Sequence, residues 1–310
     1  MNYATERCGD GVKRDIKGVV KVTSDKLRIY RRAKLDEGRL LIGLSGWMDG
    51  GNISTGTVKF FVEQLDAPKS AQIKPEGFYI YSFPGSMEIT AMFRPHTRIR
   101  DGIVESCDMP RNTFFLSEEN NLVLFAGKEP NLKWEEYADC IFSVCHRFGV
   151  KTIYFIGSVA GLVPHTRQPR FTCSVSDGDM KKTVRRYGVR MSNYEGPASI
   201  VTHMTARARD EGVGMMTLVA EIPAYVQGQN PGCISAVSRL LANILGIHIE
   251  LEKLKSIGEE FERKLSEIIE MQPELASHIG KLEEDYDNEV FDTEMGDLKE
   301  WLEQRGIRVD

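Results

Sequence analysis

The sequence lacks the features that mark membrane and secreted proteins. Among its 310 residues no apolar run is long enough to span a bilayer, and the charged segment up to Asp15 contains no apolar secretory core. The six cysteines include no C-x-x-C pair, and a chain of this length does not need disulfides to fold. We therefore expect a cytoplasmic protein that makes no membrane contact and whose thiols are reduced and mostly buried.

The sequence also lacks the common motifs of catalysis. It contains neither the G-x-x-x-x-G-K-[ST] loop nor a G-x-G-x-x-G loop after a strand, and its histidines are not spaced to share a zinc ion. Gly43-Leu44-Ser45-Gly46-Trp47 resembles a nucleophile elbow only in part, because Trp47 replaces the second glycine. We therefore assign no catalytic residue, no metal site and no cofactor, and the sequence favours a protein that is not an enzyme.

Charge is distributed unevenly along the chain. The net charge of −5 combines a segment from Leu251 onward, with 18 acidic and 8 basic residues, and a mildly basic body. The body has no stripe of lysine and arginine with interleaved aromatics, so we expect no nucleic-acid partner. The acidic tail has two interpretations: a solvated helical face, or a partner for the basic body of its own or a neighbouring subunit.

Apolar runs alternate with helical periodicity up to residue 250. The predicted strands lie at 40–44, 78–81, 122–125, 152–156 and 215–220. The predicted helices lie at 58–65, 134–148, 179–187, 200–208 and 237–245, and the region 94–110 is predicted to be irregular. This alternation predicts an α/β fold, a three-layer α/β/α sandwich with a mostly parallel sheet.

Beyond residue 250 the pattern indicates helices alone. One covers 251–268, a second begins at Pro273, and a short third surrounds Trp301. We therefore predict a sandwich domain at 1–250 and an acidic helical extension at 251–310. Packing of these C-terminal helices on the sandwich is the favoured interpretation, and an oligomerisation arm is the alternative.

Polar loops follow the predicted strands, and ligands of parallel sheets usually bind at the carboxyl ends of the strands. We expect the loops that carry Asp49, Glu129, His165 and Glu221 to be neighbours. The candidate ligand or interface residues of these loops are Trp47, Asp49, Asn52, Glu129, His165, Arg167, Glu195, Glu221 and Tyr225.

The glycine-rich loop 46–52 has two interpretations. Its backbone amides, with the start of the next helix, are suited to receive an anion. Alternatively, Asp49 or Asn52 caps the helix, and the glycines turn the chain tightly against the sheet. Capping is the simpler of the two.

Two further loops carry charged side chains. Pro164-His165-Thr166-Arg167 combines an imidazole and a guanidinium, a pair suited to a carboxylate or phosphate, and the same tetrapeptide recurs at 95–98. The alternative is a surface loop in which Arg167 pairs with a structural carboxylate. Glu221 ends an apolar strand and is costly to bury alone, so we predict Arg167 as its partner, in a structural pair or one that orients a ligand.

Taken in order, these motifs resemble the proteasome assembly chaperone 2 family. They are Gly46-Trp47 with Asp49 and Asn52, Gly127 with Glu129-Pro130, Pro164 to Arg167, Gly196-Pro197, Pro223 with Tyr225, and Asn230-Pro231. Leu282-Glu283-Glu284-Asp285-Tyr286-Asp287 resembles the helical extension of bacterial members, so the resemblance covers roughly residues 25–290.

The resemblance implies a fold like that of purine nucleoside phosphorylases and peptidyl-tRNA hydrolases, and it implies homo-oligomers or paired relatives. Eukaryotic and archaeal relatives help to assemble proteasomes, and several dock through a C-terminal hydrophobic-Tyr-X tail. This chain ends Ile307-Arg308-Val309-Asp310, so we do not expect tail docking.

Two functional hypotheses follow. The first is a non-catalytic assembly or scaffold protein that acts on a protein partner through its surface and its homo-oligomeric form. The second is a small-molecule-binding protein or enzyme, acting on a nucleoside-like or anionic ligand at the strand carboxyl edge. The second predicts a concave pocket that unites Asp49, His165, Arg167 and Glu221.

Overall fold

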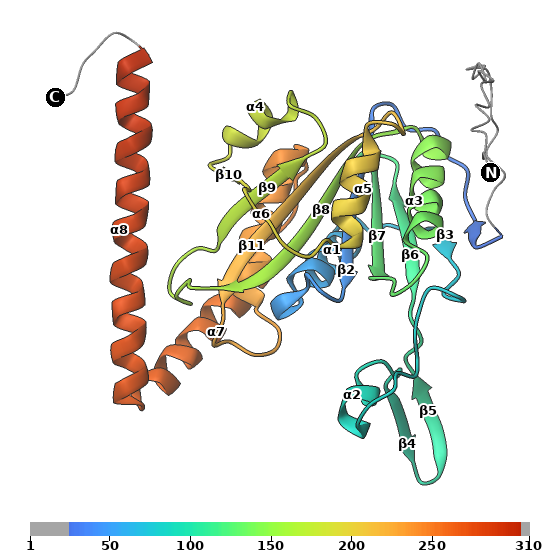
Figure 1. The fold of residues 1–310 in the computed structure, drawn as a ribbon, viewed down its shortest axis with the longest axis horizontal. Helices are drawn as coiled ribbons and strands as arrows, with labels where there is room; N and C mark the ends of the chain where they lie inside the picture. Colours follow the sequence, from blue (N-terminus) through green and yellow to red (C-terminus); the bar gives the residue numbers. More distant parts are fainter. Residues whose placement is uncertain (1–24, 305–310) are drawn as a thin grey trace, which may run out of the picture.

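A mixed sheet forms the centre of the protein (Figure 1). The structure is a computed structural model that describes residues 25–304, with side chains described as far as residue 291. Within this range nine strands pair in the order β1-β3-β6-β7-β2-β8-β11-β9-β10. Their bounds are β1 Leu27–Ile29, β2 Gly38–Ser45, β3 Lys69–Ile73, β6 Asn112–Ser117, β7 Leu122–Lys128, β8 Val150–Gly161, β9 Arg170–Val175, β10 Arg190–Met191 and β11 Gly214–Pro223.

The four central strands are parallel, and antiparallel pairs flank them. Strands β7, β2, β8 and β11 run in one direction, whereas β6 and β3 on one side and β9 on the other join through antiparallel ladders. The central strands are the longest apolar runs because helices bury both of their faces. The sheet is thus parallel in its centre and mixed toward its edges.

Helices cover both faces of the sheet. Helices α1 (Ile53–Gln64) and α6 (Pro231–Leu245) pack on one face, and α3 (Trp134–Phe148) and α5 (Ile200–Ala208) pack on the other. Alternate residues of β2 enter the two cores, with Leu40 and Ile42 in one and Leu41 in the other. A short helix, α4 (Met180–Arg185), joins β9 to β10. The predicted three-layer α/β/α fold is confirmed.

The predicted strand at 78–81 is wrong. Residues 76–78 form a turn, and the strand of this region, β3, ends earlier at Ile73. The run is apolar because its rings fill the core: Phe78 packs edge-on against Tyr137 at a centroid distance of 5.2 Å. The Tyr79 hydroxyl donates to the side-chain oxygen of Asn112 at 2.9 Å, and burial raises the pKa of Tyr79 to about 12.

Asn112, the first residue of β6, is the centre of a buried polar cluster. Its side-chain oxygen accepts hydrogen bonds from the Tyr79 and Tyr137 hydroxyls and from the backbone N–H of Lys128. These groups come from the chain before β6, from α3 and from β7. The cluster therefore fixes the point at which the chain re-enters the sheet.

The region 94–110, predicted to be irregular, forms a hairpin. Strand β4 (Thr97–Arg100) pairs with β5 (Ile103–Cys107) across the two-residue turn Asp101-Gly102, both with positive φ. A short helix, α2 (Met87–Ala91), precedes the hairpin. We call residues 82–111 the arm, because they project away from the sheet (Figure 1).

The C-terminal part of the described chain is helical. Helix α7 (Glu252–Glu270) packs on α6 so closely that a Cβ added at Gly258 would lie 2.8 Å from the Gly232 Cα. Helix α8 runs without interruption over Pro273–Gln304, so the prediction of a separate third helix is wrong. The apolar pattern is interrupted between the predicted second and third helices, but no proline follows Pro273 to break the helix.

Helix packing on the sandwich, the favoured interpretation, is confirmed for α7 and for the part of α8 near β9. No helix in residues 25–304 combines the length and apolar character needed to cross a membrane. The five cysteines from Cys107 to Cys233 are thiols, and all but Cys107 are buried. The expected absence of a docking tail concerns residues 307–310, which lie outside the described range.

Candidate functional site

Most of the candidate residues lie along one edge of the sheet, where the central strands end. The structure divides them into two clusters rather than one. We call the cluster at the ends of β2 and β7 the open end; it includes Trp47 and Glu129. We call the cluster beyond β8 and β11 the closed end; it includes His165, Arg167 and Tyr225.

At the open end Glu129 joins two loops. One carboxylate oxygen accepts a hydrogen bond from the Trp47 backbone N–H at 2.9 Å, and the other accepts from the Ile200 N–H at 3.4 Å. Ile200 is the first residue of α5, so the carboxylate also lies at the positive end of that helix. Glu129 thereby holds the glycine-rich loop and the start of α5 together.

A groove of about 400 Å³ lies over this junction. Aromatic and proline side chains form most of its wall, with Lys128 at one side: the lining includes Trp47, Lys128, Glu129, Pro130, Trp134 and Pro197. Trp47 is 68% exposed, and the Trp134 ring nitrogen donates to the Pro130 carbonyl at 2.9 Å. Such a surface is suited to an apolar side chain or an extended peptide.

The glycine-rich loop follows the capping interpretation for Asp49. The two oxygens of this carboxylate accept from the Thr55 backbone N–H at 3.0 Å and from the Thr55 hydroxyl at 2.7 Å. Burial raises the pKa of Asp49, and the hydrogen bonds from Thr55 oppose that rise. Asn52 has a left-handed backbone and makes no capping bond with its side chain. Asp49 therefore already uses the helix amides that an anion would need.

At the closed end the His165 side chain is held at both ring nitrogens. Nδ1 lies 2.8 Å from the Tyr225 hydroxyl, which also accepts the His165 backbone N–H, and Nε2 lies 2.9 Å from the Ser266 hydroxyl of α7. Burial lowers the pKa of His165, opposed by the nearby Glu283 carboxylate. The ring is thus a neutral bridge between two loops and α7.

Arg167 binds α8 rather than Glu221. Its guanidinium donates two parallel hydrogen bonds to the Asp287 carboxylate, each 2.8 Å long, and these bonds raise the pKa of Arg167. The predicted Arg167–Glu221 pair is therefore wrong. The sequence could not show that a helix 120 residues later would supply the partner.

The acidic face of α8 makes further contacts with the basic body. Arg170 pairs with Glu289 at 2.5 Å and stacks 4.5 Å over the Tyr286 ring, whose hydroxyl donates to the Gln168 carbonyl. Glu289 also accepts from Arg190 at 2.6 Å, which holds the pKa of this carboxyl below its usual range. The interpretation that the acidic tail binds the basic body of its own subunit is supported.

Two candidate residues, Glu195 and Glu221, belong to neither cluster. Glu221 sits within β11 opposite Arg170 of β9 and Val159 of β8, and it is half-buried. Glu195 is exposed. The two copies of the Pro-His-Thr-Arg tetrapeptide have unrelated surroundings, since His96 is in the arm, exposed beside Asp108.

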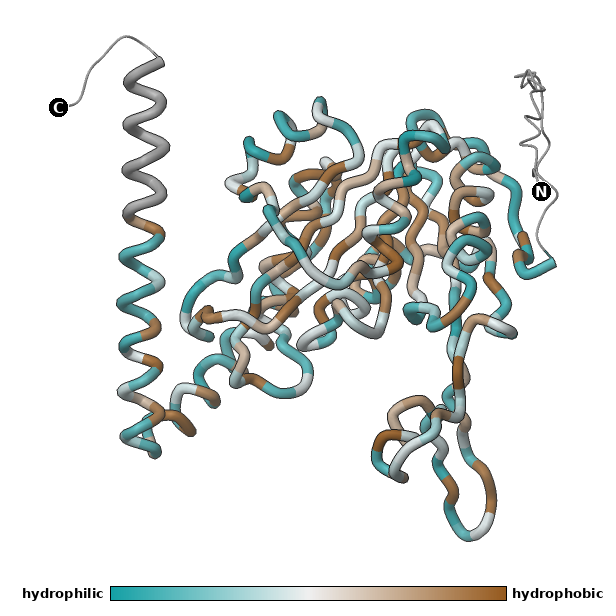
Figure 2. Tube along the Cα trace, viewed as in Figure 1, coloured by the Kyte–Doolittle hydropathy of each residue, from teal (hydrophilic) through white to brown (hydrophobic). Residues whose placement is uncertain are grey.

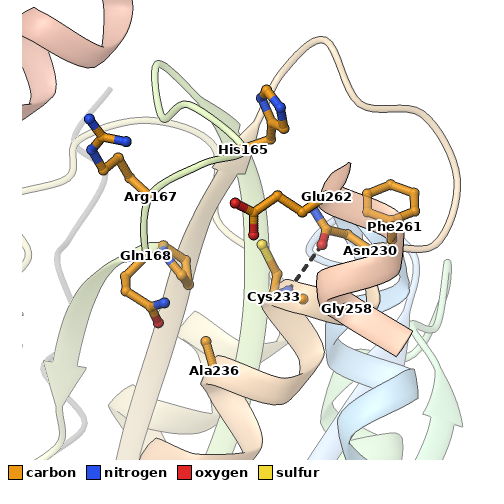
Figure 3. Close-up of a pocket in the computed structure, with 11 residues that line it drawn as sticks. His165, Arg167, Gln168, Asn230, Cys233, Ala236, Gly258, Phe261 and Glu262 are labelled. Atoms are coloured by element: carbon orange, nitrogen blue, oxygen red, sulfur yellow. Dashed lines mark hydrogen bonds between the residues drawn. The ribbon is translucent and has the colours of Figure 1, made fainter. Parts of the chain in front are cut away.

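A small cavity at the closed end lies between α6, α7 and the His165 loop (Figure 3). Its volume is about 60 Å³, and His165, Arg167, Asn230, Cys233 and Glu262 are among its lining residues, whereas Asp49 and Glu221 are not. Burial raises the pKa of the Cys233 thiol to about 12, so this thiol is not an activated nucleophile. The pocket that would unite the four predicted residues is not formed here.

Sequence reasoning missed the residues that α7 and α8 bring to the closed end. They are Ser266, Glu283, Tyr286 and Asp287. The excess of acidic residues after Leu251 was the available signal, because a basic body as partner was one of its two interpretations. An excess of charge over a whole segment does not specify which carboxylate pairs with which arginine.

Comparison with solved structures shows that other proteins share this fold over most of their length. A Mycobacterium tuberculosis protein of unknown function is 20% identical, with a TM-score of 0.78 over 91% of this chain and 95% of its own. A proteasome-assembly chaperone homologue from the same organism is 25% identical, with a TM-score of 0.66 over 78% and 99%. An archaeal proteasome activator from Pyrococcus furiosus is 18% identical, with a TM-score of 0.58 over 78% and 97%.

No curated protein matches the chain. The model of the PAC2 family, in contrast, matches residues 43–269, which include both the open end and most of the closed end. The resemblance inferred from the order of the motifs is therefore confirmed, and the chain belongs to the PAC2 family.

Proposed function

We propose that the protein is a non-catalytic assembly chaperone or scaffold that acts through its surface as a cytoplasmic homo-oligomer. One observation carries this proposal: at the closed end, the residues best suited to hold a small ligand are occupied by the protein's own helices. His165 bridges Tyr225 and Ser266, and Arg167 binds Asp287. A site for turnover needs these groups available to substrate.

The size of the closed-end cavity supports the same conclusion. Pockets for metabolites commonly measure about 300–1,000 Å³, whereas this cavity holds about 60 Å³. The larger groove at the open end is shallow and aromatic, as expected for a surface that binds a protein segment. Two structural relatives, described as a proteasome-assembly chaperone homologue and a proteasome activator, support a protein partner for this chain.

Affinity capture of the full-length protein from native lysate tests the proposal. We expect a stable complex with a second protein, recovered in constant ratio. Recovery of the homo-oligomer alone would contradict the proposal.

A thermal-shift screen with nucleosides and organic anions tests the competing enzyme hypothesis. A ligand that raises the melting temperature of wild type but not of Arg167→Ala would favour that hypothesis. We expect no such ligand, because Arg167 is already paired with Asp287.

A further inference from the structure

The arm exposes an apolar surface that no other described part of its own chain covers. Eight large apolar side chains of residues 82–111 are between 43% and 83% exposed. They are Phe83, Met87, Ile89, Met92, Ile99, Ile103, Val104 and Met109. The apolar colour of the arm is visible in Figure 2.

Summed over all sides of the arm, these eight residues expose on the order of 900 Å². A standard protein interface buries about 800 Å² on each partner. Packing within the arm is limited to contacts such as the stacked rings of Phe83 and Phe93, 5.2 Å apart. The exposed area of the arm is thus similar in size to one side of a standard interface.

Strand topology places the arm at the same edge of the sheet as the open-end groove. The chain leaves the sheet at the end of β3, passes through residues 74–81 and the arm, and returns at the start of β6, where Asn112 pairs with Ile73. Because β6 is antiparallel to β7, the start of β6 lies beside the end of β7, where Lys128 and Glu129 begin the groove. Arm and groove thus lie at the same edge of the sheet.

We propose that the arm of one copy of this protein docks in the open-end groove of a second copy. In this arrangement Met87 and Met92 of α2 pack against the aromatic and proline wall around Trp47 and Trp134. Thioether sulfur makes favourable contacts with aromatic rings, and flexible methionine side chains adapt to a shallow groove. Glu88, exposed between the two methionines, has the charge that complements Lys128 of the groove.

The charges of the arm favour a second copy over a strongly acidic or basic partner. Residues 82–111 contain four arginines and four carboxylates, so the arm carries no net charge at neutral pH. Two molecules that face each other edge to edge can each place an arm on the other's groove, which satisfies two identical contacts at once. The inference rests on the proposed homo-oligomer and names the contact that forms it.

Light scattering on size-exclusion fractions of the full-length protein, over a dilution series, tests this contact. Wild type is expected to associate. An arm variant, Met87→Asp with Met92→Asp, and a groove variant, Trp47→Asp, are each expected to weaken association on the order of 30-fold or more. All three side chains are mostly exposed, so the monomer fold is expected to remain, as circular dichroism and the melting temperature will show.

Mixing the two variants distinguishes this contact from an arm-to-arm one. The groove variant keeps its arm and the arm variant keeps its groove, so the mixture retains one of the two contacts and recovers partial association. Association of the groove variant alone, or no recovery in the mixture, would overturn the proposal. Equal weakening by Met271→Asp would do the same, because that exposed side chain lies on neither surface.

A monomeric wild type would overturn both this contact and the proposed homo-oligomer, while the partner captured from lysate would remain a separate result. Conversely, an associating wild type that captures no second protein would leave the arm contact intact and contradict the scaffold function. The two experiments therefore fail independently.

Discussion

The two ends of the strand-carboxyl edge differ in what covers them. The closed end is filled by α7 and α8, which supply partners for His165, Arg167 and Arg170. The open end has loops tied together by Glu129 but keeps an aromatic groove and an exposed Trp47. The same edge of the sheet thus packs against helices at one end and leaves an aromatic groove exposed at the other.

The largest effect is expected from a substitution that detaches α8 from the closed end. Tyr286→Ala removes a ring that is 9% exposed, stacks under Arg170 and donates to Gln168, so the docking of α8 is expected to lose about 3 kcal/mol. Hydrogen exchange of the α8 backbone measures this loss. Phe291→Ala is the matched control, because Phe291 lies on the same helix and is 62% exposed. Equal effects of the two changes would break the comparison.

The next effect concerns Arg170. Arg170→Ala is expected to weaken α8 docking by about 1–2 kcal/mol, since it removes the contact with the Tyr286 ring and the ion pair with partly exposed Glu289. Arg170→Lys keeps the charge but loses the planar group that stacks, so an intermediate value is expected. If Arg170→Lys matched wild type, the stacking contribution assigned to the closed end would be refuted.

The closed end is also expected to weaken in mild acid. Burial lowers the pKa of His165 below its ordinary 6.5, so the unfolded chain binds this proton more readily than the folded chain. The stability that neutral His165 contributes is full above about pH 6.5 and is lost progressively as pH falls below it. Asp287 and Glu289, whose pKa values are lowered, lose their contributions only at still lower pH.

Denaturant unfolding at about pH 7.5 and about pH 5.5 measures this dependence. His165→Gln keeps hydrogen-bonding groups without a proton to gain in this range, so its stability is expected to change less between the two values. A variant with the same pH dependence as wild type would show that another group is responsible.

The smallest expected effect is at the open end. Trp47→Ala in the dilute monomer is expected to change the free energy of unfolding by no more than about 0.5 kcal/mol, because the side chain is 68% exposed. Trp134→Ala is expected to cost more, since Trp134 is half-buried and donates to the Pro130 carbonyl. A large loss with Trp47→Ala would show that the groove wall is a structural contact.

The central strands could be predicted because burial on both faces makes them continuous apolar runs, as in β2 and β11. The hairpin of the arm was missed although Asp101-Gly102, between β-branched residues, is a strong local signal for a two-residue turn. At Phe78 the error was the opposite one, a strand predicted where none forms. Its apolar ring fills the core from an irregular segment.

The candidate site was predicted less completely than the fold. Its loops lie at one edge, as the topology requires, but their contacts depend on residues far apart in the chain. Glu129 meets Trp47 across 82 positions, and His165 meets Ser266 across 101. Periodicity and composition carry no information about such pairs, so they could not separate the open end from the closed end.

The buried Asn112 cluster joins the two ends of the segment that carries the arm. The chain before the arm at Tyr79 and the chain after it at Asn112 meet in one hydrogen bond, and Lys128 and α3 complete the joint. Residues 82–111 lie between these two points and project away from the sheet. Sequence changes within the arm therefore leave the hydrogen bonds that hold the edge of the sheet unchanged.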